Sequence, residues 1–270
     1  MEKIVDQTKM RVMKHLNTLK LYKIRKILDD ELANATKNKL PSLELIERLL
    51  SFEANSMVER RIERRIKESK LPDRKLLADF DFEFQKSIDK EQIMGLATLT
   101  FIDKKQGLIL AGSSGTGKSH IAKSLILSAC QRLYRCRYTT AADMLKYLMS
   151  GLSDDSLDQK LKKYISPEVL LIDEIGFDKL EQESSRNAAL FFKVIDARYC
   201  KASTIITSNI DFKEIGDYLG DPVITTAIVD RMIHHSIIIR IEGPSYRMYE
   251  SKKLNQKATT DSGNALINEK

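Results

Sequence analysis

A run of small and polar residues near the middle of the chain has the composition of a phosphate-binding loop. Residues 112–119 read Gly-Ser-Ser-Gly-Thr-Gly-Lys-Ser, which matches the pattern GxxxxGK[ST]. Three glycines let the backbone curl so that successive N–H groups face a phosphate. Lys118 is expected to reach the β- and γ-phosphates, and the Ser119 hydroxyl to bind Mg²⁺. The expected nucleotide-binding residues are Gly112, Ser113, Ser114, Gly115, Thr116, Gly117, Lys118, Ser119 and His120.

Two carboxylates follow the apolar run Val169–Ile172. Four apolar residues suit a strand that is buried on both faces, and Asp173 and Glu174 then emerge at its C-terminal edge. Asp173 is expected to hold the water shell of Mg²⁺, and Glu174 to polarise the water that attacks ATP. Such a pair can also be the plain start of a loop. The phosphate-binding loop in the same chain favours the catalytic interpretation.

Three further polar residues are candidates for the same chemistry. Asn209 ends a β-branched run, residues 203–208, and there it could orient the attacking water. The alternative is an ordinary turn, which Asn favours. Arg231 and Arg247 are candidates for the cation that many phosphoryl-transfer enzymes bring to the transition state. The alternative for both arginines is a surface salt bridge.

The pattern of apolar runs indicates which elements position these residues. Stretches with helical periodicity separate most of the runs, which predicts an α/β fold with a central parallel sheet flanked by helices. The predicted strands are Leu108–Ala111, Tyr134–Thr139, Val169–Ile172, Thr204–Thr207 and Ile237–Ile241.

The positive charge of the chain is concentrated in its N-terminal quarter. Residues 1–75 carry 19 Lys and Arg against 12 Asp and Glu, whereas residues 76–270 carry 26 of each. Apolar residues at helical spacing predict helices on either side of Pro41. A basic helical segment attracts the phosphate backbone of a nucleic acid, although it could also be a solvated helix pair. The candidate DNA-binding residues are Arg60, Arg61, Arg64, Arg65, Lys67 and Lys70.

These observations suggest three parts and exclude some classes of protein. We expect a small all-α basic domain over residues 1–75, an ATPase domain over 76–250 and a disordered tail over 251–270. No apolar run approaches the ~20 residues of a membrane span, so no membrane partner and a cytoplasmic location are expected. The three cysteines show no CxxC spacing that would suggest zinc.

Together, these motifs resemble the IstB family of ATP-binding helper proteins, encoded beside the transposase in certain bacterial insertion sequences and related to DnaC-type helicase loaders. The match runs from about residue 10 to residue 250. Its motifs are the loop 112–119, Leu171-Ile172-Asp173-Glu174-Ile175-Gly176, Thr207-Ser208-Asn209, Asp230-Arg231-Met232-Ile233-His234-His235, Ser245-Tyr246-Arg247, Lys70-Leu71-Pro72 and Asp79-Phe80-Asp81-Phe82.

The resemblance implies an AAA+ ATPase that uses ATP and Mg²⁺, forms homo-oligomers on duplex DNA with ATP sites at subunit interfaces, and recruits a transposase. By analogy, Asn209 is the residue called sensor 1, Arg231 is the arginine finger and Arg247 is the sensor 2 contact. One departure is clear: the family usually has a Trp after the sensor 1 strand, where this chain reads Phe212-Lys213-Glu214-Ile215.

Two other functions use the same loop. A replicative helicase loader would grip a protein with its N-terminal segment, and an apolar docking face would be expected where this chain has basic residues. A small-molecule phosphotransferase would need an Arg-rich lid and a second substrate pocket, and no such lid is visible in the sequence.

Overall fold

The basic N-terminal quarter of the chain is helical, as its apolar periodicity predicts. The computed structural model describes residues 2–176 and 184–253. The chain divides into two compact units, Met1–Arg64 and Arg65–Lys270. The first unit contains α1 (Glu2–Thr18), α2 (Tyr22–Asn38) and most of α3 (Ser42–Ser69). The division lies inside α3, earlier than the boundary expected at residue 75.

The helices of the first unit share a small apolar core and one buried charge. Leu16 of α1 packs with Ile24 and Leu28 of α2. The carboxylate of Glu53, on α3, accepts hydrogen bonds from the Lys23 amide at 2.6 Å and the Ile24 amide at 3.0 Å. These are orphan donors in the first turn of α2, where no side chain of the N-cap residue supplies an acceptor. Glu53 therefore caps α2 from another helix.

The second unit contains a five-stranded sheet in which every pairing is parallel. Its order is β2-β3-β4-β1-β5. The strands are β1 (Gly107–Gly112), β2 (Cys136–Thr140), β3 (Val169–Ile175), β4 (Ser203–Ser208) and β5 (Ser236–Ile241). All five predicted strands are confirmed, although β2 begins at Cys136 rather than at residue 134. Because β1, β3 and β4 are adjacent and parallel, the residues that follow them meet at one edge.

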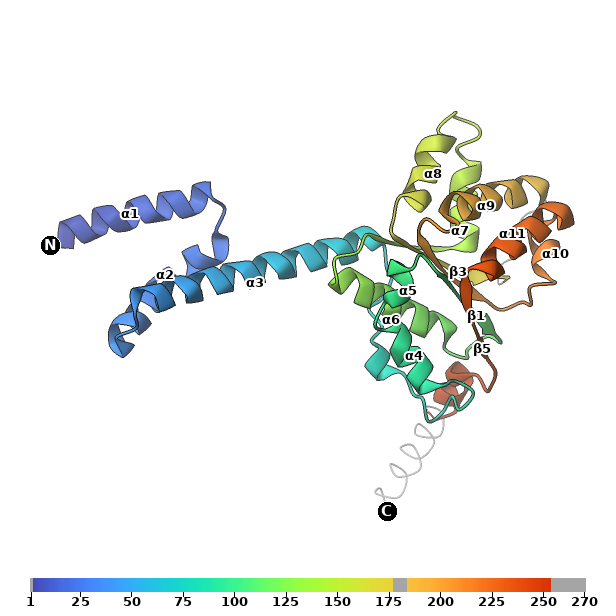
Figure 1. Ribbon diagram of the computed structural model, residues 1–270, viewed down its shortest axis with the longest axis horizontal. Coiled ribbons are helices and arrows are strands. Elements are labelled where there is room, and N and C mark those ends of the chain that lie inside the picture. Colours follow the sequence, from blue (N-terminus) through green and yellow to red (C-terminus); the bar gives the residue numbers. More distant parts are fainter. Residues whose placement is uncertain (1, 177–183, 254–270) are drawn as a thin grey trace, which may run out of the picture. The chain divides into compact units, whose positions relative to one another are not determined.

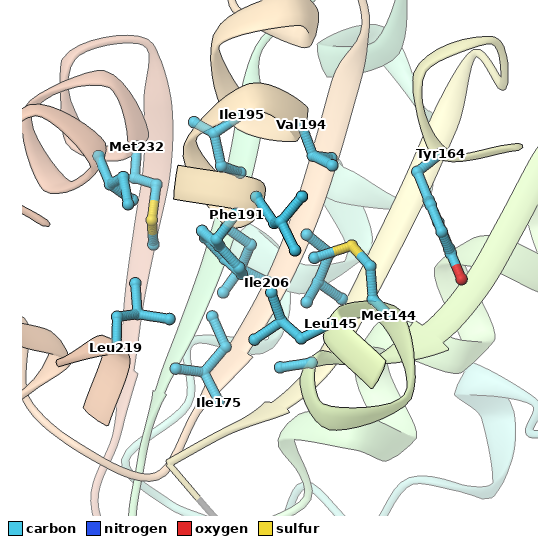
Figure 2. Close-up of a cluster of buried hydrophobic side chains, with 14 of the residues drawn as sticks. Met144, Leu145, Tyr164, Ile175, Phe191, Val194, Ile195, Ile206, Leu219 and Met232 are labelled. Carbon is cyan, nitrogen blue, oxygen red and sulfur yellow. The ribbon is translucent and has the colours of Figure 1, made fainter. Parts of the chain in front are cut away.

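Helices cover both faces of this sheet, as Figure 1 shows. On one face α6 (Lys118–Gln131) packs against β1, β2, β3 and β4. On the other face α7 (Ala141–Met149), α8 (Leu157–Ile165), α9 (Ser184–Arg198), α10 (Ile215–Leu219) and α11 (Pro222–His234) enclose the main core. In Figure 2, Phe191 and Val194 of α9 meet Met144 of α7 and Ile206 of the sheet. The predicted architecture, with helices flanking a central parallel sheet, is confirmed.

Shorter elements precede the sheet, and a helix follows it. They are η1 (Leu77–Asp79), α4 (Lys90–Leu96) and α5 (Thr100–Asp103). Residues 246–253 are helical, so the first three residues of the tail expected to be disordered have regular structure. The rest of that expected tail, 254–270, lies outside the described residues. No helix in the described ranges combines the length and apolar character needed to cross a membrane.

Candidate functional site

The loop after β1 forms a tight cradle at the start of α6. Gly115 and Gly117 have φ angles of +80° and +98°, in the region that favours glycine. A Cβ on Gly115 would lie 2.1 Å from the Ser245 hydroxyl, and one on Gly117 would lie 2.5 Å from the Phe80 ring. Each position therefore favours glycine for two reasons, the positive φ and the closeness of a neighbouring side chain. The curled backbone and the N-terminus of α6 are suited to hold a phosphate.

Lys118 lies inside this cradle. Its ammonium group donates to the carbonyls of Gly112, at 2.8 Å, and Ser113, at 2.7 Å, and the residue is only 5% exposed. Burial lowers the pKa of Lys118 to about 8, while Asp173 acts to raise it and Arg247 to lower it further. Lys118 is thus a buried cation at the loop, where the sequence predicts phosphate binding.

The acidic residue after β3 contacts the loop directly. The Ser119 hydroxyl donates to Asp173 Oδ1 at 2.8 Å, and Asp173 is fully buried. The Tyr138 hydroxyl, on β2, donates to Asp173 Oδ2 at 3.3 Å. Burial, together with the charges of Asp173 and Glu174, raises the pKa of Tyr138, so this hydroxyl keeps its proton. No local pattern indicated Tyr138, because its contact with Asp173 depends on the pairing of β2 with β3.

An irregularity in β3 sets the direction of Glu174. In a regular strand, neighbouring side chains point to opposite faces, so Asp173 and Glu174 would diverge. The register between β3 and β4 shifts between Ile172 and Ile175, and Glu174 has a φ of +65°. This bulge lets Glu174 reach the cavity beside the loop although Asp173 is buried behind it.

The loop opens into a cavity of about 600 Å³. Of the predicted site residues, it brings together Ser114, Gly115, Thr116, Gly117, Lys118, Ser119, His120, Glu174, Asn209 and Arg247. A further wall of the cavity was not predicted, and it is formed by Arg74, Lys75, Phe80, Phe84, Gln85 and Tyr246. Those residues precede the sheet or follow it, so only the fold brings them to the loop.

Arg247 reaches the cavity because the segment after β5 lies on the loop. The Tyr246 amide donates to the Gly115 carbonyl at 2.9 Å, and Ser245 occupies the space beside Gly115. Asn209 follows β4, and its backbone N–H donates to the carbonyl of Ile175 at 3.1 Å. The two predicted sensor residues therefore lie at the same cavity as Lys118 and Glu174.

Arg231 lies elsewhere. It forms a salt bridge with Asp196 at 2.9 Å, donates to the Ala227 carbonyl at 3.1 Å, and stacks over the Phe192 ring at 4.9 Å. It does not line the cavity that contains Lys118. Within one chain, the structure therefore does not bring Arg231 to the nucleotide site.

The candidate DNA-binding residues lie on α3 and directly after it. Arg60 donates to the buried Glu53 at 2.9 Å and stacks over the Tyr22 ring at 5.9 Å. Arg65 pairs with Glu68 at 3.1 Å. The remaining candidates, Arg61, Arg64, Lys67 and Lys70, are exposed. Arg60 thus has a structural role in the first unit, which the charge pattern did not predict.

These features fit a nucleoside triphosphate with Mg²⁺. The cradle and the buried Lys118 suit the phosphates, and the Ser119–Asp173 pair suits the ion, because a hydroxyl and a carboxylate are oxygen ligands that Mg²⁺ prefers. A parallel sheet in this strand order, with the phosphate loop after β1 and the acidic pair on β3, defines a P-loop protein of the AAA+ class. The family model of IstB-like ATP binding proteins matches residues 14–254. The chain belongs to this family.

Similar proteins agree with this assignment. The chain is 40% identical, over 83% of its length and 88% of the relative's, to a protein of insertion sequence IS5376 from Geobacillus stearothermophilus that is named as ATP-binding. It is 35% identical to the corresponding protein of IS232 from Bacillus thuringiensis, over 87% of this chain and 92% of that one. The AMPPCP-bound DnaA of Aquifex aeolicus shares the fold with a TM-score of 0.52 and 20% identity, over 69% of this chain and 56% of that chain.

Proposed function

We propose that the chain is a Mg²⁺-dependent ATPase that assists the transposition of an insertion sequence. The observation that carries the enzymatic part is the Ser119–Asp173 contact, at 2.8 Å, beside a cavity that Lys118 and Glu174 share. One site thus contains groups suited to phosphate, to a metal ion and to water activation.

Each residue has a role that follows from its position. Lys118 and the glycine-rich loop would hold the phosphates, and Ser119 and Asp173 would hold the ion. Bound Mg²⁺ would supply charge neutralisation at the phosphoryl group. Glu174 would take a proton from the attacking water, because its bulged position faces the cavity. Asn209, at the adjacent strand end, would orient that water.

The two arginines suggest an oligomer. Arg247 lines the same cavity as Lys118 and acts to lower the pKa of Lys118, which supports a role for Arg247 as a second cation for the phosphates. Arg231 is held by Asp196 outside the cavity of its own chain. We propose that Arg231 serves the nucleotide of a neighbouring copy, so that the ATP sites lie at subunit interfaces.

Family membership and the location of the positive charge support DNA and a transposase as the partners. The relatives named above are proteins of insertion sequences, and such elements move by the action of a transposase on DNA. The excess positive charge of this chain lies in residues 1–75. We propose that the chain acts in the cytoplasm, assembles on duplex DNA and recruits the transposase encoded beside it. The same relatives favour this function over a helicase loader.

Three purified forms of the full chain test the proposal: wild type, Lys118→Ala and Glu174→Gln. With ATP and Mg²⁺, wild type should release phosphate, and DNA should bring the chain into larger particles. Lys118→Ala should lose at least about 100-fold in nucleotide affinity, since it removes a buried charged partner of the phosphates. Glu174→Gln should bind ATP but turn over about 100-fold or more slowly, and its particles on DNA should persist.

The matched control is Lys104→Ala, because Lys104 is exposed and does not line the cavity. Nucleotide binding by Lys118→Ala at the wild-type level would contradict the loop assignment. Wild-type turnover in Glu174→Gln would remove Glu174 as the base. Preference for single-stranded DNA, without stimulation of the transposase, would favour a helicase loader.

A further inference from the structure

Thr207, on β4, contacts both carboxylate residues of the site. Its hydroxyl donates to Asp173 Oδ1 at 2.5 Å and accepts a hydrogen bond from the Glu174 amide at 2.9 Å. The side chain is 1% exposed. A hydroxyl has one proton to donate, so these two bonds fix its orientation.

The position of Thr207 follows from the bulge in β3. Ile172 pairs with Ile206 and Ile175 pairs with Ser208, so two residues of β3, Asp173 and Glu174, lie opposite the single residue Thr207. A bulge of this kind leaves backbone groups without ladder partners. The Thr207 hydroxyl supplies an acceptor for the Glu174 amide at this point.

The bond to Glu174 stabilises an uncommon backbone conformation. A non-glycine residue with a φ of +65° is less stable than one in the usual regions, because its Cβ crowds the backbone. Such a conformation persists only where the surrounding structure holds it. Thr207 is buried and rigid at χ1, because it is β-branched, so it is suited to that task.

The bond to Asp173 acts on the proposed metal site. Asp173 Oδ1 accepts from Ser119 and from Thr207. Ser119 is the hydroxyl that the proposed function assigns to Mg²⁺, so Thr207 orients Asp173 through a second, independent contact. Partners of this kind, which touch a metal ligand rather than the metal, commonly contribute 10- to 100-fold to metal affinity or activity.

We infer that Thr207 is a positioning residue that sets the directions of Asp173 and Glu174 together, through one hydroxyl. This inference rests on the proposed ATPase function, because it assigns Thr207 to the metal and water sides of the same reaction. The sequence alone does not indicate this role, because Thr207 is one of several β-branched residues in a buried strand.

The test compares Thr207→Val, which removes the hydroxyl but keeps the shape, with Thr207→Ser, which keeps the hydroxyl. In Thr207→Val, kcat should fall about 10- to 100-fold and the Mg²⁺ concentration for half-maximal activity should rise about tenfold. The KM for ATP should change less than about threefold, because the loop and Lys118 are untouched. Thr207→Ser should recover most of both losses.

A second readout does not depend on turnover. In the absence of nucleotide, hydrogen exchange of the Glu174 amide should be at least about fivefold faster in Thr207→Val than in wild type or Thr207→Ser, because the amide loses the hydrogen bond to the Thr207 hydroxyl. The matched control is Thr225→Val. Thr225 is a buried threonine of α11, and its hydroxyl has no hydrogen-bond partner among the described residues. That variant should match wild type in every measurement.

Each outcome decides a different question. If wild type hydrolyses no ATP, the proposed function fails, while the exchange of the Glu174 amide still tests the Thr207 contact. If Thr207→Val keeps wild-type kcat, Mg²⁺ dependence and amide protection, the inference is overturned. Equal losses in Thr207→Ser and Thr207→Val would also overturn it, since the hydroxyl that Thr207→Ser keeps would then not preserve the activity.

Discussion

The buried side chain of Arg198 connects several elements of the second unit. It is the last residue of α9, it is 1% exposed, and no salt bridge involving it occurs among the described residues. Its guanidinium group donates instead to carbonyls of Tyr164, Pro167 and Ser203, at 2.9, 2.7 and 2.5 Å. Burial lowers its pKa to about 10, so it remains charged at neutral pH.

The carbonyl partners of Arg198 lie where elements begin and end. Tyr164 is in the last turn of α8, whose final carbonyls lack helical partners and carry the negative end of the helix dipole. Pro167 precedes β3, and Ser203 begins β4. A single cation thus joins one helix end to two strands that carry the catalytic candidates.

Replacing Arg198 with Met should therefore be costly. The change leaves several buried carbonyls without a donor, and we expect the free energy of unfolding to fall by about 3 kcal/mol or more. Urea unfolding of the full chain measures this loss. The matched control is Arg135→Met, since Arg135 forms an exposed pair with Glu168 and such pairs contribute about 0–1 kcal/mol. Equal unfolding midpoints for the two variants would contradict the role of Arg198.

At the scale of elements, α2 depends on a charge supplied by α3. Glu53 is 2% exposed, and its carboxylate accepts from two amides in the first turn of α2 and from Arg60. Burial acts to raise the pKa of Glu53, but the hydrogen bonds from Ile24, Arg60 and Lys23 outweigh it, so the pKa lies below its ordinary value of 4.5. An anion at a helix N-terminus is also favoured by the helix dipole.

This depressed pKa predicts a pH dependence. The stabilisation by Glu53 should be fully present above pH 4.5, the unfolded value, and should be lost as the pH falls through the folded pKa. At neutral pH, Glu53→Gln should increase hydrogen exchange at the Lys23 and Ile24 amides about fivefold, the equivalent of one lost cap. After correction for intrinsic rates, the difference from wild type should shrink in acid.

The control for this experiment is Glu47→Gln, because Glu47 is an exposed residue of the same helix. It removes the same charge without touching α2. The cap assignment fails if both variants give the same exchange at Lys23 and Ile24, or if the effect of Glu53→Gln does not diminish below pH 4.5.

For the molecule as a whole, the excess positive charge lies in residues 1–75, which extend from the first unit into the second. Arg74 and Lys75, at the end of this range, line the cavity, whereas the basic residues of α3 do not. Two basic residues of α3, Arg60 and Arg65, already pair with carboxylates. The exposed residues Arg61, Lys67 and Lys70 are therefore better candidates for DNA contact than Arg60 and Arg65.

Replacing Arg61, Lys67 and Lys70 together with Gln should weaken DNA binding for all sequences alike. Each lost phosphate contact lowers the slope of log affinity against log salt by about 0.9, so three contacts predict a decrease of up to about 2.7. Titrations of labelled duplex DNA at several salt concentrations measure this slope. Replacing the exposed lysines Lys86, Lys104 and Lys201 removes the same net charge and is the control. Equal slopes for the two triple variants would place the DNA contacts elsewhere.

The sequence by itself determined the features that depend on neighbouring residues. The loop 112–119 is recognisable because glycines at fixed spacing and a helix start are local properties of the backbone. The five strands could be predicted because buried parallel strands are short, continuous apolar runs. The end of α2 could be predicted as well, since Pro41 follows it closely.

Only the tertiary structure decided which distant residues share the site. In a regular strand, the side chains of Asp173 and Glu174 would point to opposite faces of the sheet. The bulge opposite Thr207 changes the direction of Glu174, which then lines the cavity. Arg247 reaches the cavity because the segment after β5 lies on the glycine loop. The cap that Glu53 gives α2 depends on the packing of two helices. In each case, the deciding contact joins residues about 30 or more positions apart, and no local pattern specifies such a pairing.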